Sequence, residues 1–116
     1  MTSSATPMGL WERDPRRYWE GFTEALTAAG VDSPALVLDT SALEHNVADL
    51  LRRAGGVPIR LASKSLRVRS VIADLVARPG FAGVLAYDLD EARWLATESG
   101  ITDVLMGYPT AVSYTH

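Results

Sequence analysis

The sequence predicts an α/β fold, a partial (β/α)8 TIM barrel of about four strands preceded by an N-terminal helix. From residue 33 onward, short apolar runs alternate with stretches of helical periodicity, which is typical of βα units around a parallel sheet. The 116 residues suit one modest domain. An open doubly wound sheet fits the same pattern. Because a complete barrel needs about 250 residues, the barrel interpretation makes this chain a fragment.

The composition excludes several classes of function. A net charge of −3 argues against a nucleic acid or an anionic membrane as the main partner. The absence of cysteine rules out a disulfide or a thiolate metal site, and with two histidines we expect no metal site. The first residues lack the pattern of a signal peptide, and no apolar run reaches membrane-spanning length. We therefore expect a cytoplasmic protein.

Residues 1–32 are predicted to hold a polar tail and one amphipathic helix. Asp14 and Pro15 form a helix start, with Asp at the N-cap and Pro at the first helical position, and Gly30 ends the pattern. Apolar and aromatic side chains recur between them at helical spacing, at Tyr18, Trp19, Phe22, Ala25, Leu26 and Ala29. We expect this helix to pack its aromatic stripe on the rest of the protein.

Strands and helices are predicted to alternate over residues 33–111. The strands are the apolar runs at residues 34–38, 57–62, 83–86 and 101–106. The first helix begins at a capping box formed by Ser41 and Glu44, and Asp88 and Glu91 begin the third helix in the same way. The helices cover about residues 41–54, 68–76 and 88–99, and they end at Gly55, at Arg78-Pro79-Gly80 and at Gly100.

Lys64 is the only lysine among eleven basic residues, and it follows the second predicted strand. Functional groups collect at the carboxyl ends of strands in both candidate architectures. Alternation along the strand places Arg60, Ala62 and Lys64 on one face, so that Lys64 would lie at the mouth of a barrel and Arg60 deeper. An amine can condense with a carbonyl, whereas a guanidinium cannot.

The neighbourhood of Lys64 is strongly basic in sequence. Five arginines and no Asp or Glu accompany it between Arg52 and Ala73. Such a setting favours the neutral, nucleophilic amine and attracts anionic ligands. Two interpretations stay open on the residues alone: a catalytic lysine, or an ordinary surface lysine in an arginine-rich composition.

Two segments resemble a known family. They read "SPALVLDTSALEHNVADLLRRAGGVPIRLASKS" and "GFAGVLAYDLDEARWLATESGITDVLMGYPT". They resemble the N-terminal part of fold-type III pyridoxal-phosphate enzymes, whose barrel is of the alanine racemase type. The most similar branch is the D-threonine aldolase and D-serine dehydratase group of amino acid deaminases and aldolases. Four features carry the resemblance: the "LVLDTSALEHN" opening, a strand ending in lysine, the "LDEA" helix start and the final "YP".

The resemblance implies a cofactor and roles for three residues. Lys64 matches the lysine that holds pyridoxal 5'-phosphate as a Schiff base and moves protons at the substrate. Tyr87 matches a position that faces the cofactor ring, and Arg67 is a candidate contact for the cofactor or a carboxylate. Other positions are read as structural: Asp39 as a cap, Asn46 as a helix residue, His45 as a helix-surface residue, and Tyr108-Pro109 as a turn.

The implied function is that of the N-terminal portion of a pyridoxal-phosphate-dependent amino acid lyase. Its substrate would be a small amino acid, and the full-length protein would be a homodimer. An amino acid racemase of the same fold and a non-catalytic cofactor-binding or homeostasis protein are the alternatives. The family's aldolases and dehydratases often carry "HAKTHK" around the lysine, where this chain has "LASKSLR", and this difference favours the deaminase/aldolase branch.

Two further expectations concern the limits of the chain. The family's phosphate-binding loop and second catalytic group are expected beyond residue 116, so the chain alone is expected to be inactive. Residues 112–116, "VSYTH", are interpreted as a tail derived from a sequencing adapter. A nucleotide-binding doubly wound domain is disfavoured because no glycine-rich loop follows any predicted strand.

Overall fold

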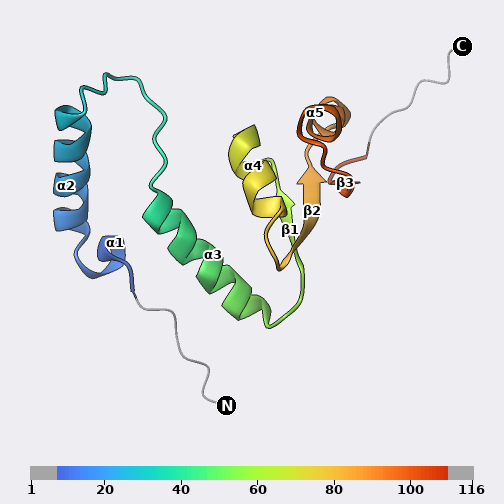
Figure 1. The fold of residues 1–116 in the computed structure, drawn as a ribbon, viewed down its shortest axis with the longest axis horizontal. Helices are drawn as coiled ribbons and strands as arrows, with labels where there is room; N and C mark the ends of the chain where they lie inside the picture. The colour runs from blue at the N-terminus through green and yellow to red at the C-terminus, as the bar shows by residue number, and fades with distance from the viewer. Residues whose placement is uncertain (1–7, 110–116) are drawn as a thin grey trace, which may run out of the picture. The chain divides into compact units, whose positions relative to one another are not determined.

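A computed structural model describes residues 8–109, which combine helices with a small parallel sheet (Figure 1). The chain divides into two compact units, the first ending at Arg53 and the second beginning at Ala54. The interpretation of residues 112–116 lies outside the described residues. The elements in chain order are α1 (Leu10–Arg13), α2 (Pro15–Ala28), α3 (Thr40–Ala54), β1 (Ile59–Ala62), α4 (Arg69–Val76), β2 (Phe81–Ala86), α5 (Leu89–Ser99) and β3 (Val104–Met106).

The N-terminal helix α2 forms as predicted. The Asp14 carboxylate accepts a hydrogen bond of 3.1 Å from the Arg17 amide, Pro15 occupies the first turn, and Gly30 adopts a positive φ of 68° beyond the helix. The sequence did not predict the single turn α1 that precedes it. Within the first unit the aromatic stripe of α2 contacts α1, where the Tyr18 and Trp11 rings lie 6.0 Å apart. No residue of α2 is buried.

The predicted strand over residues 34–38 is wrong. These residues are extended, but they pair with no strand among residues 8–109. A strand persists through its hydrogen-bonded partner and through burial of at least one face. Neither is present in this segment, where Leu36 is 89% exposed and Leu38 is 50% exposed. The β-prone composition of the segment is therefore not sufficient to make a strand here.

Helix α3 begins one residue earlier than predicted, and its cap is different. Asp39, not the expected Ser41, caps the helix, because its carboxylate accepts a hydrogen bond of 3.0 Å from the Ala42 amide. The same carboxylate accepts a hydrogen bond of 2.7 Å from the Tyr18 hydroxyl, which links it to α2. The interpretation of Asp39 as a structural cap is confirmed.

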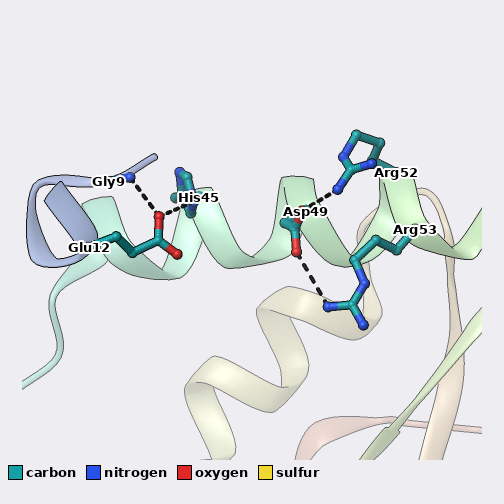
Figure 2. Close-up of polar contacts among 6 residues, drawn as sticks. All are labelled: Gly9, Glu12, His45, Asp49, Arg52 and Arg53. Carbon is teal, nitrogen blue, oxygen red and sulfur yellow. Dashed lines mark hydrogen bonds and ion pairs between the residues drawn. The ribbon is translucent and has the colours of Figure 1, made fainter. Parts of the chain in front are cut away.

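Ion pairs and hydrogen bonds lie near both ends of α3 (Figure 2). The Glu12 carboxylate accepts a hydrogen bond of 3.0 Å from the Gly9 amide and lies 3.8 Å from the His45 ring nitrogen. Near the carboxyl end, Asp49 pairs with Arg52 at 2.7 Å and with Arg53 at 3.5 Å. Because both arginines are one turn away on the same helix, these pairs neutralise charge locally.

The second unit is built on a three-stranded parallel sheet in the order β1-β2-β3. The register aligns Leu61, Val84 and Val104 in one row. The adjacent row is Ala62, Leu85 and Leu105, which faces the opposite side of the sheet because successive side chains alternate. Three of the four predicted strands are thus confirmed as elements; β1 and β3 begin later than predicted, and β2 begins two residues earlier.

Helices α4 and α5 cover one face of this sheet. They contact each other and β2, and the buried core between helices and sheet consists of Ile72, Val84, Leu95 and Ile101. Leu61 and Val104 pack against this core, so their row faces the helices. On the other face Leu105 is 55% exposed. Within residues 8–109, none of the helices is both long and apolar enough to cross a membrane.

Candidate functional site at the carboxyl ends of the strands

The carboxyl ends of the three strands bring together a lysine and two tyrosines. Lys64 lies two residues beyond β1, Tyr87 lies one residue beyond β2, and Tyr108 lies two residues beyond β3. Parallel strands end at one edge of their sheet, so residues that are far apart in sequence meet there. We call Lys64, Arg67, Tyr87 and Tyr108 the strand-end cluster.

A tight turn presents the Lys64 side chain to solvent. Ser63 is 1% exposed, and its amide donates a hydrogen bond of 3.1 Å to the Leu85 carbonyl. The Ser63 hydroxyl also contacts the Glu91 carboxylate in the first turn of α5. On the other side, Leu66 packs against the core, and its amide donates to the Ser63 carbonyl at 3.1 Å. Lys64 is therefore an exposed residue between two anchored ones.

The Lys64 amine points toward both tyrosines. Its Nζ lies 3.5 Å from the Tyr108 hydroxyl, at the outer limit of a hydrogen bond. The same atom lies 5.9 Å from the ring centroid of Tyr87 and 5.8 Å from that of Tyr108, within the range of cation–π attraction. The two rings pack edge to face with centroids 5.2 Å apart. The Lys64 amine therefore lies beside two aromatic rings that pack against each other.

Arg67 completes the cluster. Its guanidinium carbon lies 5.4 Å from the Tyr87 ring centroid, and its Nε donates a hydrogen bond of 3.2 Å to the Lys64 carbonyl. The guanidinium thus lies over the same ring that faces the amine, and its remaining N–H groups can bind an anion. The three sequence-predicted site residues, Lys64, Arg67 and Tyr87, are all brought together.

The basic neighbourhood expected around Lys64 is largely balanced by carboxylates. Arg60 makes a two-pronged ion pair with Asp103, with distances of 2.7 and 3.1 Å, and Arg69 lies 3.6 Å from Glu98. Hydrogen bonding from Arg60 lowers the pKa of the Asp103 carboxyl below its usual range. Arg52 and Arg53 pair with an aspartate of their own helix. The arginine count between residues 52 and 73 therefore overstates the local positive charge.

Tyr108 and His45 have surroundings that differ from those expected from the sequence. The sequence predicts only a turn at Tyr108, although this residue lies two positions past a strand, as Lys64 does. His45, expected on the helix surface, is only 19% exposed at its side chain, and its ring packs edge to face with Trp11 at 4.9 Å. His45 and Asp39 both belong to the first unit and are not part of the strand-end cluster.

The arrangement is suited to carbonyl chemistry. It combines an exposed primary amine, a hydroxyl that can exchange protons with it, and a guanidinium for an anionic group. In the described part of the chain, no group of three or more metal-ligating side chains is placed to hold an ion. No family model, curated protein or solved structure matches this chain.

Proposed function

We propose that this chain binds pyridoxal 5'-phosphate covalently through the Lys64 amine, as the N-terminal portion of an amino acid lyase of the D-threonine aldolase or D-serine ammonia-lyase type. The observation that carries the proposal is the strand-end cluster. Its amine is exposed, and it lies 3.5 Å from a tyrosine hydroxyl and 5.9 Å from the Tyr87 ring centroid. The sequence resemblance supplies the identity of the aldehyde.

The residues present fit this cofactor. A planar aldehyde that carries a phosphate needs a reachable amine, a flat surface for its ring and a cation for its phosphate. Lys64 supplies the amine, Tyr87 is 38% exposed and its ring supplies a surface, and Arg67 supplies a cation beside that ring. When bound, pyridoxal phosphate acts as an electron sink for bonds at the substrate α-carbon. Lys64 would hold the cofactor and move a proton at that carbon.

We extend the proposal to the architecture, a partial (β/α)8 barrel of the alanine racemase type. Two features support it: the strands follow one another in the order β1-β2-β3, and α4 and α5 pack together on one side of β2. In a barrel, neighbouring strands follow one another in chain order and all helices lie on the outer side of the sheet. In a doubly wound sheet, the strand order reverses at one point and helices cover both faces.

The proposed partners follow from this function. The substrate is a small amino acid, whose carboxylate suits a basic side chain such as Arg67. The complete protein is a homodimer in this proposal, and the cysteine-free composition supports a cytoplasmic setting. An amino acid racemase would use the same anchor, so turnover of D-serine, D-threonine or alanine decides between the reactions.

The single lysine makes a direct test possible. The 116-residue chain is incubated with pyridoxal phosphate, reduced with borohydride and mapped by mass spectrometry. Because the chain has one lysine, the only amines are Lys64 and the N-terminal amino group. We expect a pyridoxyl adduct on the peptide that contains Lys64, and we expect Lys64→Arg to lose it, because a guanidinium keeps the charge but does not form the bond. An adduct confined to the N-terminus would overturn the proposal.

A second comparison separates a built site from an ordinary reactive lysine. Arg67→Gln is expected to weaken pyridoxal-phosphate binding by roughly tenfold, the loss of about one charge-assisted contact. Arg69→Gln is the matched control, since it removes the same charge two residues away, where the partner is the exposed Glu98 at 3.6 Å. Equal weakening in both variants would indicate general charge attraction rather than a site.

A further inference from the structure

Tyr108 is held close to Lys64 by its own turn. The Gly107 amide donates a hydrogen bond of 2.8 Å to the Ala86 carbonyl, which ties the end of β3 to the end of β2. A Cβ at Gly107 would approach the Ala86 oxygen to 3.0 Å, so a residue with a side chain fits poorly there. The backbone next to Tyr108 is therefore constrained, although Tyr108 itself is 52% exposed.

The two tyrosines of the strand-end cluster differ in what they offer the amine. Both ring centroids lie at nearly the same distance from the Lys64 Nζ, 5.9 Å for Tyr87 and 5.8 Å for Tyr108. Of the two hydroxyls, that of Tyr108 makes the hydrogen-bonding contact with Nζ among the described residues. Such contacts are often long in an empty site and shorten when the reactant binds.

We propose that the Tyr108 hydroxyl is the proton relay for the Lys64 amine when it bonds to an aldehyde. The proposal rests on the proposed function and deepens it, by giving a catalytic role to a residue that the sequence assigned only to a turn. A phenol can accept a proton from nitrogen and donate one to oxygen, and the 3.5 Å contact places it beside the reacting atom.

The step balances with the phenol unchanged. The nitrogen lone pair of the neutral amine forms a bond to the aldehyde carbon, and the carbon–oxygen double bond is broken. Both hydrogens of the amine end on the departing oxygen, which leaves as water, and nitrogen and carbon share a double bond. Tyr108 accepts protons from the nitrogen and delivers protons to the oxygen, so it needs no further reactant.

The test compares two matched variants. Tyr108→Phe and Tyr87→Phe each remove one hydroxyl and keep the ring that faces the amine. The rate of the visible absorbance change on adding pyridoxal phosphate is measured across pH for both variants and the wild type. We expect Tyr108→Phe to react about tenfold more slowly than Tyr87→Phe and to change the shape of the pH profile more than Tyr87→Phe does. This effect is smaller than the ~10²–10⁴-fold typical of general acid–base catalysis, because Tyr108 is exposed and water can replace its hydroxyl in part.

The outcomes distinguish the inference from the proposed function. If the wild type reacts at Lys64 and Tyr108→Phe reacts equally fast, the relay is overturned and the cofactor anchor stands. Equal slowing in both variants also overturns the relay, since it would point to a shared packing effect. If the wild type forms no adduct at Lys64, both proposals are overturned.

A cofactor-free measurement keeps the inference testable if Tyr108→Phe does not fold. In a chain labelled only at lysine, all lysine signals in the NMR spectrum come from Lys64. We expect nuclear Overhauser contacts from its terminal methylene to the Tyr108 ring in the wild type. Contacts to Tyr87 alone would overturn the relay, whatever the behaviour of the variants.

Discussion

Gly83 lies where β2 and the residue before β3 approach too closely for a side chain. Its φ is 126°, and a Cβ built on it would collide with the backbone oxygen of Asp103. The Val84 amide donates to that same oxygen at 2.9 Å, and the Arg60 guanidinium pairs with the Asp103 carboxylate. The glycine therefore permits both the strand pairing and the ion pair.

We predict opposite effects for two Gly→Ala changes. Gly83→Ala should lower the free energy of unfolding by at least about 1–3 kcal/mol, because alanine is strained at this φ and meets the backbone of the next strand. Gly21→Ala is the control, since a Cβ there meets nothing within 4 Å inside α2. It should stabilise by about 0.5–1 kcal/mol. Urea denaturation measures both, and a neutral Gly83→Ala would contradict the packing described here.

The Asp39–Tyr18 hydrogen bond gives the first unit a stability that depends on pH. The bond from Tyr18 and the amide of Ala42 lower the pKa of the Asp39 carboxyl, while the hydrogen bond to Asp39 raises the pKa of the Tyr18 hydroxyl. Asp39 therefore stabilises above its unfolded pKa of about 4, and this contribution is lost as pH falls through the lower folded value. Tyr18 stabilises below about pH 10, and this contribution is lost as pH rises through the raised folded value.

We predict that each of two substitutions reduces the pH dependence of stability at one end of the pH range. Asp39→Asn should flatten the acid limb in part, because an amide does not titrate, and Tyr18→Phe should flatten the alkaline limb. Tryptophan fluorescence is a suitable readout, since the Tyr18 ring lies 5.0 Å from the Trp19 ring and 6.0 Å from the Trp11 ring. If both variants kept the wild-type dependence of the denaturant midpoint on pH, the bond would not be a source of stability for the unit.

At the level of the elements, helix ends agree best with the sequence. The caps at Asp14 and Asp88 are confirmed by bonds to the amides of Arg17 and Glu91, and Gly100 adopts the left-handed conformation expected of a C-cap. These signals are local, because the capping group and its amide are three residues apart. The sequence therefore contains all that is needed to predict them.

We predict that the capping hydrogen bond of Asp88 contributes more to the stability of α5 than its negative charge does. Asp88→Ala should cost about 1 kcal/mol, because it leaves the Glu91 amide without its 2.8 Å hydrogen bond. Asp90→Ala removes an equal charge from the same first turn without removing the cap. It should cost only a few tenths of a kcal/mol through the helix dipole. Thermal unfolding of the two variants gives the comparison, and equal losses would attribute the effect to charge alone.

Features that depend on distant partners were the ones that the sequence could not predict. Residues 34–38 have the composition of a strand, but their pairing depends on residues elsewhere in the chain. The sequence near Lys64 overstates the local positive charge, because Asp103 and Glu98, which pair with Arg60 and Arg69, follow them by more than 25 residues. Tyr108 joins the site through the meeting of strand ends, which becomes visible only once the strand order is known.

Within the second unit, helices α4 and α5 cover one side of the sheet, and no other helix of that unit in residues 54–109 covers the opposite side. Helices α4 and α5 bury the row of Leu61, while Leu105 on the other side is 55% exposed. The outer edges of β1 and β3 pair with no further strand in residues 8–109. An open apolar face with free edges favours association with another sheet.

We predict that the 116-residue chain associates with itself in a concentration-dependent manner. Leu105→Lys should weaken this association by placing a charge on the open face, and Leu50→Lys on α3 is a control of similar exposure, 47% against 55%. Sedimentation velocity over a range of concentrations reports the change. A wild-type chain that remains monomeric throughout, or equal effects of both variants, would exclude the sheet face as the contact.

The turn at residues 63–66 is held by two residues that flank Lys64. Ser63 is buried, Leu66 packs against the core, and a backbone hydrogen bond joins the two. The side chain of residue 64 points outward and contributes neither to the core nor to that hydrogen bond. Exchanging that side chain should leave the surrounding geometry intact. Substitutions at residue 64 should therefore place a thiol, an imidazole or an unnatural aldehyde-reactive group in the same exposed position without changing the fold of the unit.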